Sequence, residues 1–201
     1  MEQEKQMNEK ESLALIQRMV ITAQQGVQDS GFFFLLWGWL VFAASLSSWV
    51  LIHFFAGKFM DLPWIILMPA GGLVSMIYGR KVESKKRVKT YADSVLKYVV
   101  IAFLASLFIV MGCGAATLGW VKTYSFILII YGSWLFISGG VLKFRPLIIG
   151  GIINWLCAIG SFWIKDYHII LLLAFAVLSG YVIPGHLLRI AFFKDKKDGG
   201  V

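Results

Sequence analysis

Residues 98–119 read YVVIAFLASLFIVMGCGAATLG and contain no charged side chain. At a rise of about 1.5 Å per residue, a helix of this length spans the ~30 Å of hydrocarbon in a membrane. The stretch is apolar almost all round, whereas a helix on the surface of a water-soluble fold keeps one polar face. These residues therefore predict a membrane-spanning helix over 96–119.

Similar apolar blocks precede and follow this helix. They predict five further spans at 32–56, 63–79, 124–142, 147–164 and 167–190. The blocks are continuously apolar, which excludes the short alternating strands of a membrane β-barrel. Composition agrees, because 59% of the chain is hydrophobic and 15% is charged, against about 25% charged in soluble domains. We expect an all-α integral membrane bundle of about six transmembrane helices over residues 32–190.

The two ends of the chain have a different character. Residues 1–31 carry Asn8 and Glu11, a pair suited to starting a helix, followed by an apolar stripe at helical spacing. This segment predicts a cytoplasmic amphipathic helix. Such a helix either lies on the membrane or under the bundle, or docks a cytoplasmic protein. Residues 191–201 form a basic tail.

The basic residues are unevenly divided between the two sides of the predicted bundle. One side holds 16 Lys and Arg and the other holds three, Lys58, Lys122 and Lys165. The positive-inside rule places the basic side, with both termini, in the cytoplasm. The net charge of +8 thus reflects topology, and we expect no nucleic-acid partner. The dense loop 80–89 either only fixes topology or also contacts anionic lipid, through Arg80, Lys81, Lys85, Lys86, Arg87 and Lys89.

Aromatic residues cluster at the predicted span ends. Those at the outer ends are Trp49, Trp64, Trp120, Tyr124, Trp163 and Tyr167. Tryptophan and tyrosine favour the depth of the lipid headgroups, because one part of each ring system is apolar and the other forms hydrogen bonds. His53 and His168 fall at the same ends and His186 at an inner end. We interpret all these side chains as interfacial.

The middle of every predicted span lacks Asp, Glu, Lys and Arg. Ion-coupled transporters and proton relays usually place ionisable groups at that depth, and intramembrane enzymes need a nucleophile with a base, or metal ligands. The two cysteines, Cys113 and Cys157, lie within apolar blocks as small packing residues. The sequence therefore predicts no enzyme, no metal site and no cofactor.

Asn154 is the strongest polar residue at membrane depth. Gly150, Cys157 and Ser161 recur with it at helical spacing and form a small, polar helix face. Small residues let two helices approach closely, and an amide can form a hydrogen bond between them. The face predicts either a helix–helix contact or the lining of a solute cavity.

Two prolines fall inside predicted spans. Pro69 lies near the middle of span 63–79, and Pro184 lies near the cytoplasmic end of span 167–190. Proline removes one backbone hydrogen bond and displaces the carbonyl four residues earlier, so we expect each site to interrupt and kink its helix. Such breaks are usually architectural, but they also expose backbone dipoles that transporters use to bind solutes.

Four segments together are similar to a group of small bacterial inner-membrane proteins of uncharacterised function. They are ESLALIQRMV (11–20), DSGFFFLLWGWLVFAASL (29–46), ISGGVLKFRPLIIGGIINW (137–155) and SGYVIPGHLL (179–188). The resemblance covers most of residues 11–190 and implies a six-span inner-membrane protein with no known active site.

These patterns favour one class of function over its main alternative. We expect a non-enzymatic, multi-pass membrane protein that acts through protein or lipid partners. The alternative is a small transporter or channel for a neutral or weakly polar solute, built around Asn154 and the proline-containing spans.

Overall fold

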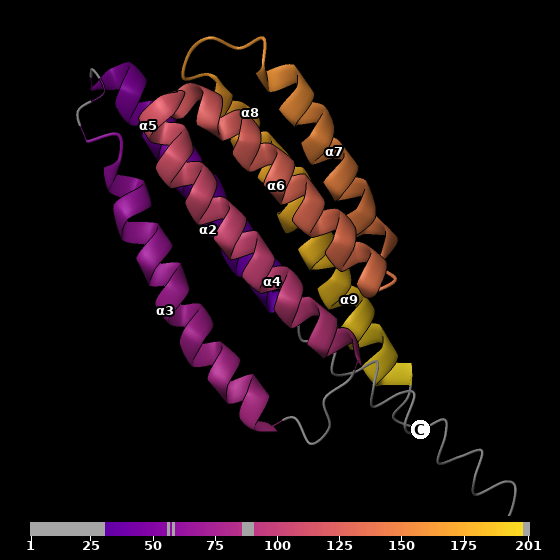
Figure 1. The fold of residues 1–201 in the computed structure, drawn as a ribbon. Helices are drawn as coiled ribbons and strands as arrows, with labels where there is room; N and C mark the ends of the chain where they lie inside the picture. Colours follow the sequence, from indigo (N-terminus) through magenta and orange to yellow (C-terminus); the bar gives the residue numbers. More distant parts are fainter. Residues whose placement is uncertain (1–30, 56, 58, 86–90, 199–201) are drawn as a thin grey trace, which may run out of the picture.

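The computed structural model describes residues 31–55, 57, 59–85 and 91–198. Every regular element within these ranges is a helix, which confirms the all-α prediction (Figure 1). The amphipathic helix predicted for residues 1–31 lies outside the described residues, apart from Gly31.

The described elements follow one another as six helical rods. Their bounds are α2 (Gly31–Phe54), α3 (Leu62–Lys85), α4 (Tyr91–Ile109) continuing into η1 (Val110–Gly114) and α5 (Ala115–Thr117), α6 (Trp120–Val141), α7 (Arg145–Ser161), and α8 (Ile169–Val177) continuing into η2 (Leu178–Val182) and α9 (Ile183–Asp198). η1 and η2 are π-helical turns within otherwise α-helical rods.

Five of these rods are long and apolar enough to cross a membrane. The stretch 147–164, predicted as a sixth span, corresponds to α7, an apolar helix of 17 residues that is shorter than the rest. Other predicted bounds differ as well: α3 continues past residue 79 to Lys85, α4 begins at Tyr91, and α9 continues past residue 190 to Asp198, into the predicted tail.

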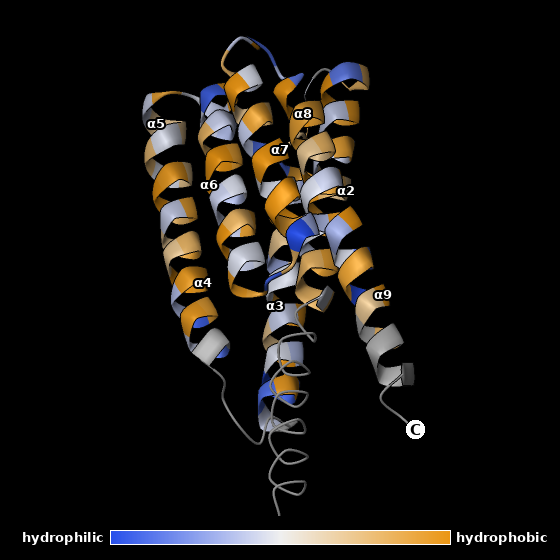
Figure 2. Ribbon diagram, turned by 90° about the vertical axis from the view of Figure 1, so that its right-hand side faces the viewer, coloured by the Kyte–Doolittle hydropathy of each residue, from blue (hydrophilic) through white to orange (hydrophobic). Residues whose placement is uncertain are grey.

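The rods run alternately up and down, so the connections gather at two ends (Figure 1). We call the end with residues 54–61, 118–120 and 162–168 the upper end. The end with the α6–α7 turn, the last residues of α3 and the first of α4 is the lower end. Figure 2 shows strongly apolar residues recurring along the helices between these ends.

The core lies between α2, α6, α7 and the rod from α8 to α9. Its fully buried side chains include Leu128, Leu135, Leu147, Leu173 and Val177. α3 packs mainly against α2, and α4 mainly against α6. Only 6% of the apolar stretch of each of these two helices is buried, against 61% of Ile169–Ala191. α3 and α4 are therefore peripheral.

The outer surface of the bundle is apolar. Exposed aliphatic and aromatic side chains occur on all six rods, among them Ile65, Ile77, Ile101, Phe108 and Leu156. Monomeric soluble proteins rarely expose apolar surface of this extent, whereas lipid solvates it. The helices are therefore those of a membrane protein.

Glycines let α6 and α7 approach each other closely. A Cβ atom added at Gly139 would lie 2.7 Å from the backbone nitrogen of Ile148, and one added at Gly151 would lie 2.8 Å from the carbonyl oxygen of Gly132. No rotamer change relieves a clash with backbone. The short distance between these two helices thus depends on glycine.

The two proline-containing helices differ from each other. α3 is one continuous α-helix across Pro69, so the predicted interruption there is wrong. A single missing N–H leaves the bonds on both sides intact, and helices in membranes tolerate it. In the last rod the departure from α-helical geometry is η2, which ends just before Pro184. Pro184 is the second residue of α9, which continues directly from η2.

The neighbouring residues Gly139 and Gly140 test the α6–α7 contact. We predict that Gly139→Ala lowers the free energy of unfolding by about 1–3 kcal/mol, the usual effect of overpacking. A Cβ at Gly140 meets nothing within 4 Å. Gly140→Ala should therefore be neutral, or stabilising by up to about 1 kcal/mol. Reversible unfolding in mixed detergent micelles measures both, and equal effects of the two substitutions would contradict the contact.

Candidate functional site

Asn154 lies in the middle of α7 and has no exposed surface. Its Nδ2 donates one hydrogen bond to the Gly150 carbonyl oxygen at 2.8 Å, within α7. It donates a second to the Ala176 carbonyl oxygen at 3.0 Å, across to α8. The Oδ1 atom of Asn154 is buried and has no partner among the described residues. The amide thus ties α7 to α8.

The other residues of the predicted polar face lie on the same buried side of α7. Gly150 packs on Gly180, and a Cβ added to Gly150 would lie 2.8 Å from the Gly180 Cα. Cys157 is buried with its thiol free. Ser161 Oγ donates a hydrogen bond to the Ala158 carbonyl oxygen at 2.6 Å. The structure therefore uses this face for close packing on the rod from α8 to α9.

The prolines do not join Asn154 in one site. Pro184 is fully buried at the start of α9. Pro69 is exposed on α3, which packs mainly on α2. The structure thus separates residues that the transporter hypothesis had grouped together.

Part of the basic loop is described. Arg80 and Lys81 are exposed on the last turns of α3, at the lower end. The side chain of Lys85, and the residues Lys86, Arg87 and Lys89, lie outside the described part of the chain. The two described cations face outward at the end of the bundle, where headgroups would meet them.

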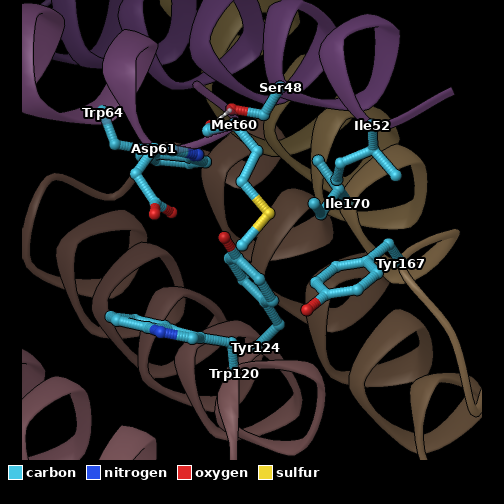
Figure 3. Close-up of a pocket in the computed structure, with 9 residues that line it drawn as sticks. All are labelled: Ser48, Ile52, Met60, Asp61, Trp64, Trp120, Tyr124, Tyr167 and Ile170. Atoms are coloured by element: carbon cyan, nitrogen blue, oxygen red, sulfur yellow. Dashed lines mark hydrogen bonds between the residues drawn. The ribbon is translucent and has the colours of Figure 1, made fainter. Parts of the chain in front are cut away.

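A small pocket opens at the upper end, where three connections meet (Figure 3). Its volume is about 10 Å³, which is room for about one water molecule. The lining side chains that matter for its chemistry are Met60, Asp61, Trp64, Trp120, Tyr124 and Tyr167. We call this the upper-end pocket.

Local sequence explains how the pocket walls are positioned. Gly57 and Phe59 have positive φ and turn the chain sharply after α2. Ser48 Oγ then donates a hydrogen bond to the Met60 carbonyl oxygen at 2.8 Å, which fixes the loop to α2. Gly119, also at positive φ, turns the chain into α6. Trp120 and Tyr124 follow one helical turn apart.

Four aromatic side chains line the upper-end pocket, Trp64, Trp120, Tyr124 and Tyr167. The ring centroids of Trp64 and Tyr124 are 6.3 Å apart, and those of Trp120 and Tyr124 are 6.5 Å apart. The Trp64 Nε1 atom is buried and has no hydrogen-bond partner among the described residues. In Figure 3 the Tyr124 hydroxyl points toward the Asp61 side of the pocket, and the Tyr167 hydroxyl lies on the other side of the Tyr124 ring.

The structure also brings two histidines together at the upper end. The His53 ring lies 5.2 Å from the His168 ring and stacks on Trp49 at 4.4 Å. The His168 backbone N–H donates to Asp166 Oδ1 at 3.0 Å, and His168 Nε2 lies 3.8 Å from Asp166 Oδ2. Among the described residues, no three His, Cys, Asp or Glu side chains form a group that could hold a metal ion.

The sequence predicted that the tryptophans and tyrosines of the pocket are interfacial. It did not predict that they line one pocket together with Asp61. Asp61 was not singled out. Its scarcity could have indicated it, because Asp29 and Asp61 are the two acidic residues in the long stretch between Glu11 and Glu83. It directly precedes Leu62, the first residue of α3, and so lies at the upper end of the bundle.

Comparison with protein-family models, curated proteins and solved structures gives no match for this chain. The resemblance to small six-span bacterial inner-membrane proteins stays a prediction.

The Asn154 contact can be tested by substitution. We predict that Asn154→Ala lowers the free energy of unfolding by about 1 kcal/mol, because an interhelical hydrogen bond in a membrane contributes roughly 0.6 kcal/mol and the truncation adds a void. Ser133→Ala is the control, since the Ser133 hydroxyl donates only to the Ile129 carbonyl of its own helix, and it should change stability by less than half as much. Unfolding in mixed micelles measures both, and an Asn154→Ala protein as stable as the wild type would refute the contact's role.

Proposed function

We propose that this chain is a six-span bacterial inner-membrane protein with both termini in the cytoplasm. In this arrangement α7 is the short fifth span. Its 17 residues cover about 25 Å at 1.5 Å per residue. The i to i+3 hydrogen bonds that follow, from the N–H groups of Phe162, Trp163 and Ile164, continue the turn to residue 164. The small remaining mismatch with ~30 Å of hydrocarbon is of the kind a bilayer absorbs by thinning.

Within that architecture, the chain acts by binding partners at its surfaces rather than by catalysis or by conducting a solute through its centre. The observation that carries this proposal is the filled centre around Asn154. Its amide is used in two hydrogen bonds, and a glycine backbone lies directly against the same face. A conduit would need space where these atoms touch.

Two partner sites belong to this proposal at the cytoplasmic side. Arg80 and Lys81, with the basic residues up to Lys89, contact anionic lipid headgroups at about 1 kcal/mol per basic residue. The predicted amphipathic helix in residues 1–31 docks a cytoplasmic protein. Neither role needs an ionisable group at membrane depth.

A small transporter for a neutral or weakly polar solute is the second candidate. One observation favours it: several buried oxygens have no hydrogen-bond partner among the described residues. They are Ser45 Oγ, Ser138 Oγ, Asn154 Oδ1 and the Tyr181 hydroxyl. Buried polar atoms are normally paired, so a passing solute or water would find acceptors here.

Thiol labelling at Cys157 separates the two candidates. In a Cys113→Ser background, we predict no reaction of Cys157 with small water-soluble thiol reagents from either side of the membrane, because Cys157 is buried. Lys165→Cys, in the exposed connection between α7 and α8, should react readily as the positive control. Labelling of Cys157 that a solute or blocker slows would favour the transporter and overturn the binding proposal.

A further inference from the structure

We propose that the upper-end pocket binds the primary ammonium head of a small amine or of an amine-bearing lipid. The inference rests on the proposed binding function and names one ligand class for it. The pocket does not include Asn154, so the amine site and the proposed binding function can be tested separately.

Charge favours a cation in this pocket. Asp61 provides a carboxylate at its rim, and no Lys, Arg or His among the described residues lies within ion-pair distance of that carboxylate. The Tyr124 hydroxyl adds an oxygen that points toward the Asp61 side of the pocket (Figure 3). A primary ammonium carries three N–H donors and no acceptor. Its donors match these oxygen acceptors in kind.

The pocket walls favour the same ligand. A cation within about 6 Å of a tryptophan or tyrosine ring is attracted by the negative face of the ring. The Tyr124 ring centroid lies 6.3 Å from that of Trp64 and 6.5 Å from that of Trp120, so a cation in the pocket would have aromatic rings beside it. A metal ion would instead prefer several oxygen ligands, and the described residues supply a single carboxylate here.

Size decides which ammonium fits. A volume of about 10 Å³ holds about one water-sized group, and an NH₃⁺ head is close to water in size. A trimethylammonium head is several times larger and would have to displace the Met60 side chain, which occupies the middle of the pocket (Figure 3). The pocket is therefore specific for primary over quaternary ammonium groups.

The Trp64 Nε1 atom, which has no hydrogen-bond partner among the described residues, restricts the choice of ligand further. An indole N–H can only donate, so it needs an oxygen beside the ammonium. An ethanolamine group supplies one two carbons away, as a hydroxyl in the free amine or as a phosphate ester in a lipid headgroup. The pocket opens where the spans end, at headgroup depth, so both sources present the same chemistry to it.

The first arm of the test uses free amines. The full chain is purified in maltoside micelles without amine lipid, and ethanolamine and methylammonium are titrated by ligand-observed NMR. We expect saturable binding of both, and at least tenfold weaker binding of tetramethylammonium. Asp61→Asn should weaken ethanolamine binding at least tenfold. Equal binding of the quaternary ion, or no effect of Asp61→Asn, would overturn the proposal.

Matched controls lie at the same end of the bundle. Asp166→Asn removes a second exposed carboxylate, 62% exposed and outside the pocket, and should leave ethanolamine binding within twofold. Trp120→Leu should weaken it severalfold, whereas Trp163→Leu, at a 75% exposed tryptophan outside the pocket, should not. Trp120 is itself 41% exposed, so this variant tests the pocket even where Asp61→Asn fails to fold.

The second arm identifies the source of the ammonium. If the ligand is the lipid, native mass spectrometry of protein taken from mixed phosphatidylethanolamine and phosphatidylglycerol bilayers should show one bound phosphatidylethanolamine. The Asp61→Asn protein should not retain it. If it is the free amine, ethanolamine binds with equal affinity in bilayers with and without phosphatidylethanolamine. Absence of binding in both arms contradicts the site. The outcome of Cys157 labelling does not depend on any of these results. It tests the proposed function separately from the amine site.

Discussion

In hydrocarbon, every backbone N–H and C=O group needs a partner inside the protein, because lipid offers none. This constraint accounts for the all-helical chain and for how its irregularities are handled. Several hydroxyl groups in the spans donate to a carbonyl of their own helix, as Thr117 does to the Cys113 carbonyl at 2.7 Å and Ser179 to the Phe175 carbonyl at 3.0 Å. The two π-helical turns keep the chain hydrogen-bonded where an α-helix would not continue. Positive-φ turns occur only between helices in the described residues.

Because lipid is as apolar as the core, burial of apolar surface does not select which helices pack together. Close approach and a few hydrogen bonds do so instead. Gly139 and Gly151 bring α6 and α7 together, and Gly150 with Asn154 joins α7 to the last rod. α3 is joined to α2 by a hydrogen bond from Trp37 Nε1 to Ser75 Oγ at 3.1 Å, but α3 and α4 bury little of their length and stay at the periphery. The bundle thus has a tightly packed part and two peripheral helices, and its polar pocket lies at one end, between α2, α6, α8 and the start of α3.

Much of this fold was predictable from sequence, since apolar length and charge position depend on single segments. The residue composition of 98–119 is sufficient for a span, and the separation of basic residues is sufficient for a topology hypothesis. Contacts between segments were not predictable in the same way. Trp64, Trp120, Tyr124 and Tyr167 each satisfied the rule for interfacial aromatics, so nothing in their own neighbourhoods indicated that three connections would gather them around Asp61. The prediction for Pro69 was wrong for a different reason. It used the rule for helices in soluble proteins, which overstates the effect of one missing backbone hydrogen bond in a membrane helix.

The central claim is that α7, short as it is, crosses the membrane and so makes the spans six. Single cysteines at its two ends test this in the Cys113→Ser background. Lys143→Cys lies in the α6–α7 turn and Lys165→Cys in the connection to α8, both at exposed positions. A membrane-impermeant maleimide added to intact cells should label the cysteine at position 165 and leave that at position 143 unlabelled until the membrane is permeabilised. Labelling of both positions from outside, or of neither, would contradict the account.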